Sequence, residues 1–126
     1  MSPTLHPGDF LWIRKTNTFH RGQIALLKQR NEEFHLKRIV GMPGESIQIR
    51  AGSLRIGGQT HAESYVPEAS HLQPESDRSW VLGASGCIVL GDARDDSLDS
   101  RKLGPVTLDQ ILGVAVFRLW PPPFAL

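Results

Sequence analysis

The sequence predicts a single, mainly β domain of antiparallel sheets and hairpins that spans residues 1–126. Its length is close to the commonest size of one domain. Its 12 glycines and 9 prolines favour many turns over long helices. Its apolar residues fall in short runs, and several of these runs alternate with polar residues as half-buried strands do.

The N-terminal half carries the clearest strand signals. Apolar runs at residues 9–14, 23–28 and 33–40 predict three strands, and the polar residues 29–32 predict a hairpin between the last two. Gly41, Pro43 and Gly44 then end the third strand, because proline lacks an N–H donor and glycine allows sharp turns. Residues 45–50 and 53–56 alternate around a two-residue turn, which predicts a second hairpin.

The C-terminal half is predicted to be less regular. Residues 57–78 are polar and show no sustained period, so we expect a long surface excursion there. Apolar runs at residues 80–82, 87–90 and 113–119 predict further strands, with one helical turn at residues 108–112. We expect the three prolines at 121–123 to end regular structure.

Charge and cysteine content exclude several classes of function. Fourteen Lys and Arg against thirteen Asp and Glu give a formal charge of +1, which disfavours a nucleic-acid partner. Cys87 is the single cysteine, so it forms no intrachain disulfide, and its apolar neighbours predict a buried core residue over a reactive thiol. No stretch approaches the roughly 20 apolar residues that span a bilayer, so we expect no membrane-spanning segment within these residues.

The sequence gives no signal for a metal or a cofactor. Its five histidines have no metal-ligand spacing and only one cysteine to join them. The acidic loop at residues 91–104 departs from a calcium loop at three key positions, which are Arg94, Ser97 and Leu103. Trp12 and Trp120 lie in predicted strands and are expected in the core, with an exposed apolar rim as the alternative.

Three segments carry the functional signal, and we call them the first, second and third box. They are residues 1–9 (MSPTLHPGD), 37–45 (KRIVGMPGE) and 91–104 (GDARDDSLDSRKLG). In order and spacing they resemble three signature segments of the bacterial-type signal peptidase I family, whose members are serine endopeptidases with a Ser/Lys dyad. The fourteen-residue match in the third box makes chance improbable, although Ala93 replaces the family's usual Asn. The supporting positions that match are Pro3, Thr4, Leu5, Gly8, Asp9, Arg38, Gly41, Pro43, Gly44, Gly91, Asp92, Arg94, Ser100 and Gly104.

The resemblance implies a catalytic role for four residues. It makes Lys37 the general base, gives Ser97 the task of orienting the lysine amine, and pairs Asp99 with Arg101 to fix the loop. A serine hydroxyl needs a proton acceptor, and a lysine can accept only when apolar surroundings favour its neutral amine. Strand alternation places Lys37 on the same face as His35, which permits an inward lysine without requiring one. The alternatives are a solvated strand lysine and a polar turn whose side chains cap backbone donors.

The nucleophile of the family falls outside the printed residues. With Pro3, Thr4 and Leu5 in the family register, Met1 takes the place of an internal Met and the serine would come directly before it. Ser2 occupies a variable position, and using it would displace the turn by two residues. We therefore expect the printed chain to lack hydrolytic activity, either as a fragment or late start, or as a nucleophile-free relative.

The resemblance implies a membrane-associated endopeptidase on the extracytoplasmic face. It would cut signal peptides or propeptides from exported proteins after small residues, with the substrate extended beside a strand edge, an anchor before residue 1, and no metal or cofactor. The alternatives are a peptide-binding pseudoprotease, a dedicated maturation protease of the same superfamily, and the LexA-like self-cleaving peptidases. The last group lacks the third box and ranks lowest.

Overall fold

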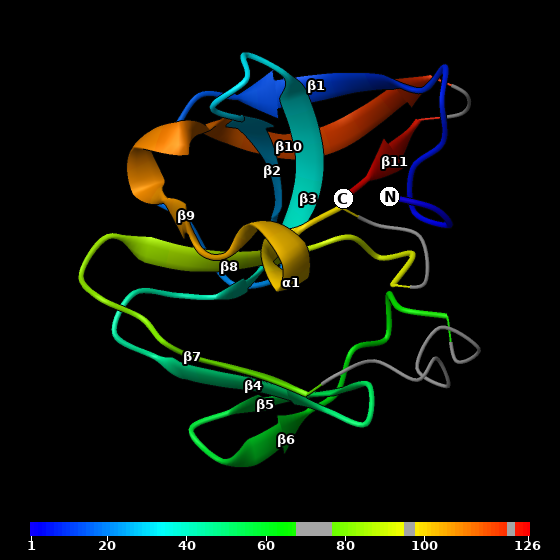
Figure 1. Cartoon of the computed structure of the whole chain (residues 1–126). Coiled ribbons are helices and arrows are strands. Elements are labelled where there is room, and N and C mark those ends of the chain that lie inside the picture. Colours follow the sequence, from blue (N-terminus) through cyan, green and yellow to red (C-terminus); the bar gives the residue numbers. More distant parts are fainter. Residues whose placement is uncertain (68–76, 95–97, 121–122) are drawn as a thin grey trace.

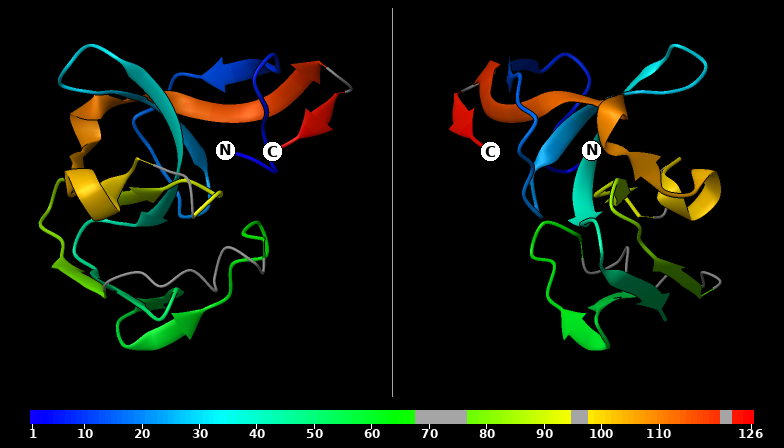
Figure 2. Two further views of the ribbon diagram at one scale, coloured as in Figure 1. Left: turned by 45° about the vertical axis from the view of Figure 1, so that its right-hand side comes forward. Right: turned by 90° about the vertical axis from the view of Figure 1, so that its left-hand side faces the viewer.

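The computed structural model describes residues 1–67, 77–94, 98–120 and 123–126. It confirms the mainly β prediction, since the described residues form two antiparallel sheets with one short helix and one 3-10 turn (Figure 1). The views in Figure 2 show the second sheet below the first, with the N-terminus beside the first sheet. Among the described residues, no helix has the length and apolar character needed to cross a bilayer.

The first sheet has the order β1-β10-β2-β3-β8-β9, and β11 extends it by pairing with β10. All of these pairings are antiparallel, and β2 and β3 form the predicted hairpin. The strands are β1 Phe10–Arg14, β2 Ile24–Lys28, β3 Phe34–Gly41, β8 Gly86–Leu90, β9 Val106–Thr107, β10 Ile111–Trp120 and β11 Phe124–Ala125.

The second sheet has the order β6-β5-β4-β7, with β6 Gln59–His61, β5 Ser53–Ile56, β4 Ser46–Arg50 and β7 Arg78–Val81. The predicted hairpin of β4 and β5 is present. The predicted surface excursion over residues 57–78 is exposed at residues 57–62, but it departs from the prediction where β6 forms and where Glu63 and Val66 are buried. Residues 68–76 of the excursion lie outside the described residues.

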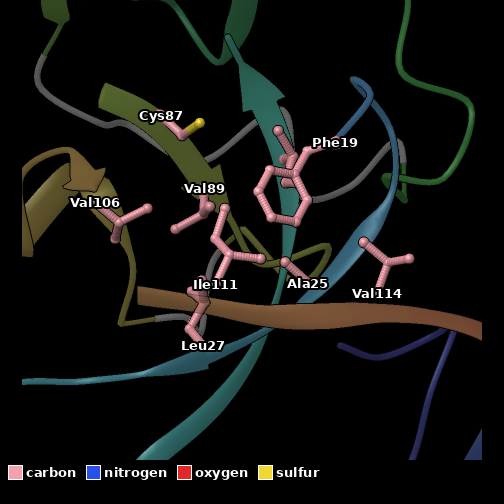
Figure 3. Packing of buried hydrophobic residues seen from close by; sticks show 9 residues of the cluster. Phe19, Ala25, Leu27, Cys87, Val89, Val106, Ile111 and Val114 are labelled. Atoms are coloured by element: carbon pink, nitrogen blue, oxygen red, sulfur yellow. The ribbon is translucent and has the colours of Figure 1, made fainter. Parts of the chain in front are cut away.

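Strand β8 joins two parts of the core. Its Cys87 and Val89 side chains pack into the cluster of the first sheet, whereas Ile88 and Leu90 pack toward the second sheet. Figure 3 shows side chains from β2, β8 and β10 meeting in the first of these clusters. A strand with both faces buried has no polar face to show, which explains its continuous apolar run.

Gly41 lies where the two parts of the core come closest. A Cβ atom at this position would lie 2.8 Å from Ile47 Cγ1 and 2.9 Å from Ile88 Cβ. Only glycine lets β3 pass this close to β4 and β8. Packing of the fold therefore requires a glycine at position 41 of the second box.

Two further expectations are corrected. Trp12 is 57% exposed and not part of the core, because Leu11 and Ile13 are the inward residues of β1. The prolines at 121–123 do not end regular structure, because β11 follows them and pairs with β10. The burial of the Trp120 side chain lies outside what the structure describes.

Candidate active site

Lys37 lies in β3, opposite Ala25 of β2, and lines a cavity of about 390 Å³. The cavity is bounded on the N-terminal side by the first box, and its apolar lining comes from Met1, Leu5, Leu36 and Leu98. Residues 1–5 form a turn in which the Leu5 N–H donates to the Met1 carbonyl over 3.0 Å, and Leu5 itself is buried. The fold thus places the first box and the predicted base of the second box around one cavity.

One edge of β3 next to this cavity is not covered by any described strand. Strand β2 pairs with β3 from Phe34 to Arg38, but β8 pairs with the other edge of β3 only from Arg38 onward. Among the described residues, no strand covers that other edge at residues 34–37. Strand edges of this kind are places where an extended peptide can pair with a sheet.

A second cavity of about 350 Å³ lies beside the first and shares His35 and Leu98 with it. The His35 ring lies 3.4 Å from the Gln29 amide nitrogen and 3.2 Å from a Glu33 carboxylate oxygen. The lining of this cavity also includes Asn31. Polar side chains therefore line the second cavity where it meets the hairpin of β2 and β3, beside the edge of β3 that no described strand covers.

Arg38, the residue after Lys37, connects all three boxes. Its Nε and Nη2 atoms donate to the two Asp92 carboxylate oxygens over 2.8 and 2.7 Å, and its Nη1 donates to the Gly22 carbonyl. The Thr4 hydroxyl donates to the same Asp92 carboxylate over 2.7 Å. Arg38 and Asp92 are both buried, so this pair is both charge-assisted and desolvated.

A second buried pair lies next to the first. Arg94 donates to both carboxylate oxygens of Glu63, over 3.0 Å for one of them, and its Nε donates to the Gly91 carbonyl over 2.8 Å. The Tyr65 hydroxyl donates to Glu63 over 2.9 Å, and the Arg38 guanidinium carbon lies 4.0 Å from the centroid of the Tyr65 ring. Burial, followed by the neighbouring Glu63 carboxylate, raises the pKa of Tyr65, so its hydroxyl remains a donor.

Asp99 and Arg101 form an ion pair, with Nε–Oδ1 and Nη2–Oδ2 distances of 2.9 and 3.0 Å. Asp99 also accepts from the Gly91 N–H and caps helix α1 (Ser100–Leu103) through the Arg101 N–H. Burial alone would raise the pKa of Asp99, but the hydrogen bonds from Arg101 and Gly91 outweigh it and hold the pKa below its ordinary value. The Ser100 hydroxyl accepts from the Val89 N–H, which ties the helix to β8.

The other predicted positions are mainly structural. Asp9 accepts from the His6 N–H, and Gly104 closes α1 with a positive φ of 81°. Gly8 and Gly44 also have positive φ, and Pro3 is exposed whereas Pro43 is half-buried. Ser97 lies outside the described residues, so its predicted contact with the lysine amine stays a prediction.

Glu63 and Tyr65 are the site residues that sequence reasoning missed. Both lie in the segment that was predicted to be a surface excursion. A lone Glu and Tyr in a polar stretch give no local signal, and only the fold brings them to Arg94 and Arg38.

Cys87 is fully buried as predicted, and burial raises the pKa of its thiol to about 11. Within the described part of the chain, no cluster of three or more His, Cys, Asp or Glu side chains could hold a metal ion.

One face of the first sheet carries exposed apolar side chains, which we call the apolar rim. Phe10 and Trp12 of β1 are 66% and 57% exposed, and Trp12 is in register with Phe117 of β10. Leu119 of β10 is exposed as well, whereas the exposed Phe124 of β11 is in register with Arg118 and belongs to the other face. Exposed aromatic side chains on adjacent strands are unusual for a surface that faces only water.

Comparison with known proteins gives consistent matches. The family model described as "Signal peptidase, peptidase S26" matches residues 1–120. A signal peptidase I of Leptolyngbya laminosa is 36% identical over an alignment of 137 positions, which covers 96% of this chain and 64% of the relative's length. A signal peptidase IB of Staphylococcus aureus is 27% identical, with 96% of this chain and 73% of the relative covered. The crystal structure of a signal peptidase I from Enterococcus faecalis superimposes with a TM-score of 0.68 and 28% identity, over 77% of this chain and 96% of that one.

Proposed function

Because this chain belongs to the signal peptidase, peptidase S26, family, we propose that it is the catalytic part of a serine endopeptidase that removes signal peptides or propeptides from exported proteins. The observation that carries the proposal is the position of Lys37, in a cavity that Met1, Leu5, Leu36 and Leu98 line together with His6, Pro7 and His35, beside the edge of β3 that no described strand covers. Apolar surroundings disfavour the ammonium form and so favour the neutral amine that a general base requires.

The substrate would lie as an extended segment beside residues 34–36 of β3, along the edge that no described strand covers. The side chains of Met1, Leu5, Leu36 and Leu98 along this cavity suit an apolar side chain next to the scissile bond. The more polar second cavity lies within reach of a neighbouring substrate residue, because it shares His35 with the first.

The proposed reaction uses a serine hydroxyl and the Lys37 amine as a catalytic dyad. The Lys37 amine takes the proton of a serine hydroxyl while the serine oxygen attacks the scissile carbonyl. The ammonium then gives this proton to the leaving amine as the peptide bond breaks, and an acyl-enzyme remains. Water attacks the acyl group, again with Lys37 as proton acceptor, and the second product leaves. Ser97 is assigned to orient the amine, and the nucleophile is assigned to the position directly before Met1.

The test uses the protein extended by a serine before Met1 and by its upstream segment, with a signal-peptide substrate that has small residues at the cleavage site. Lys37→Ala should abolish turnover. Lys37→Arg should be equally inactive, because a guanidinium group stays protonated and cannot accept a proton. A near-normal rate in the Arg variant would rule out the dyad.

The printed chain is the matched control for the position of the nucleophile. It should fold and show no turnover above background, since it holds the base and the scaffold without the assigned serine. Turnover that Ser2→Ala removes would show that the register of the first box is wrong. Peptide binding without turnover in the extended protein would favour the pseudoprotease alternative.

We assign the apolar rim to contact with the membrane surface. Interfacial aromatic side chains bind the headgroup region of a bilayer, where signal peptides are presented. Replacing Trp12 and Phe117 by Ser should reduce co-sedimentation of the printed chain with phospholipid vesicles. Val81→Ser removes an exposed side chain from the second sheet and should have no effect. Equal losses for both proteins would refute a specific membrane face.

A further inference from the structure

Glu63 and Tyr65 belong to none of the three boxes, yet they contact the second and the third. The Glu63 carboxylate binds the Arg94 guanidinium through both oxygens, and the side chains are 1% and 5% exposed. The Val66 N–H donates to the Glu63 carbonyl over 3.2 Å, and Val66 is buried. The turn at residues 63–66 is thus anchored by its own backbone and by a core side chain.

Tyr65 links this pair to the second box. Its hydroxyl donates to Glu63, and its ring lies against the Arg38 guanidinium. The edge of that guanidinium binds Asp92, so the ring and the carboxylate together leave Arg38 little freedom. Tyr65 therefore connects two buried ion pairs, Arg38 with Asp92 and Arg94 with Glu63, whose formal charges cancel.

Both arginines lie next to the proposed catalytic groups in the chain. Arg38 follows Lys37 in β3, so a shift of Arg38 would move the lysine backbone. Arg94 stands three residues before Ser97, and Leu98 lines the cavity of Lys37. Residues 63–65 contact both arginines. They therefore set the distance between the second and third boxes at the cavity.

We propose that Glu63 and Tyr65 are positioning residues, which hold the third box against β3 and so support the roles that the proposed function gives to Lys37 and Ser97. Only the kinetic part of this inference rests on the proposed function. The structural part, that residues 63–65 hold the third box locally, can be tested without any catalytic activity.

The first experiment measures hydrogen–deuterium exchange of the printed chain. Glu63→Gln leaves Arg94 without its charge partner, so exchange should rise about tenfold or more at residues 89–94 and 98–104, and less than about twofold in β4 and β5. Leu54→Ala is the matched control, because it opens a fully buried site in the second sheet. That variant should raise exchange first in β4 and β5. Equal acceleration in both regions by Glu63→Gln would overturn the local role.

The second experiment is a double-mutant cycle in the extended, active protein. Glu63→Gln should lower kcat about tenfold or more with KM within about twofold, because Glu63 acts on the orientation of the base and not on substrate binding. In a Ser97→Ala background the same change should cost less than about threefold. Fully additive effects, or a loss confined to KM, would overturn the positioning role.

Tyr65 variants keep the test decisive if Glu63→Gln does not fold. Tyr65→Phe removes one hydroxyl and retains the ring on Arg38, so we expect a loss in kcat of less than about threefold. Tyr65→Leu removes the ring as well and should lower kcat several times further. Equal kcat values for the Phe and Leu variants would refute the part assigned to the ring. If the extended protein is inactive in every form, the proposed function fails, and the exchange result still decides whether residues 63–65 hold the third box.

Discussion

Replacing Asp99 by Ala should destabilise the protein strongly and lower its activity. The Asp99 side chain is fully buried and accepts four hydrogen bonds, from the Gly91 N–H and from the N–H, Nε and Nη2 of Arg101. The Ala variant would leave the Arg101 guanidinium, which is 8% exposed, without this partner. Removing one member of a buried ion pair costs about 3–5 kcal/mol. Unfolding entropy for 126 residues is about 0.26 kcal/mol/K, so the melting temperature should fall by about 11–19 °C.

Calorimetry of the printed chain gives the melting temperature, and turnover per folded molecule of the extended protein gives the activity. Ser97→Ala deletes a single hydroxyl and should lower the rate while changing the melting temperature by less than about 3 °C. Arg101→Met in the Asp99→Ala background removes the guanidinium group that has lost its Asp99 contacts and should restore much of the lost stability. A fall of only a few degrees in the single variant, or no recovery in the double variant, would refute the buried-pair argument. Equal melting losses for the Ser97 and Asp99 variants, with activity intact, would make the third box a structural turn only.

The pH dependence of the same variant gives an independent check. The pKa of Asp99 is lowered in the folded protein, so its stabilising contribution is complete above the ordinary pKa of about 3.9 and is lost as the pH falls through the lowered value. Chemical denaturation should therefore show a smaller difference between the parent and Asp99→Ala at low pH than at pH 7. A difference that grows on acidification would contradict the assigned sign.

Three further predictions concern the scaffold. Gly41→Ala should cost about 1–3 kcal/mol of unfolding free energy, because the added methyl group meets Ile47, and a melting temperature within 1 °C of the parent would contradict this. Arg38→Lys should cost at least about 1 kcal/mol in denaturant titration, since an ammonium group cannot bind Asp92 through two parallel hydrogen bonds. Cys87 should resist iodoacetamide at pH 8 until the protein unfolds, as followed by mass spectrometry, because burial raises its pKa to about 11; rapid labelling of the native protein would count against it.

Local patterns predicted the elements whose partners are close in the sequence. The hairpins of β2 with β3 and of β4 with β5 have short turns, so alternation and turn residues together specify their register. The apolar run of β8 also gave a correct strand, because burial on both faces leaves a strong signal. The paired strands of these hairpins are close in the sequence, so local patterns are enough to predict them.

The errors came from contacts between distant segments. The two-residue strands β9 and β11 exist only through pairing with β8 and β10, so no local period marks them. Trp12 was expected inside because β1 is apolar on both faces, and the sequence alone does not say which face meets the core. For the site, the boxes predicted the Asp99 and Arg101 partners two residues apart, but they gave no indication of Glu63, which lies 31 residues from Arg94.

The second box places two cations at consecutive positions of one strand, and the fold gives them opposite surroundings. Arg38 binds two carboxylate oxygens and a tyrosine ring, and these contacts favour a permanent charge. Lys37 lines a cavity whose wall includes Met1, Leu5 and Leu98 beside His6 and His35, and the proposed function requires a neutral amine there. Because successive residues of a strand point to opposite faces, a single register of β3 satisfies both requirements, and a slip by one residue would satisfy neither. The buried arginine network therefore fixes the register on which a lysine base depends, and this coupling connects the stability of the fold to the proposed chemistry.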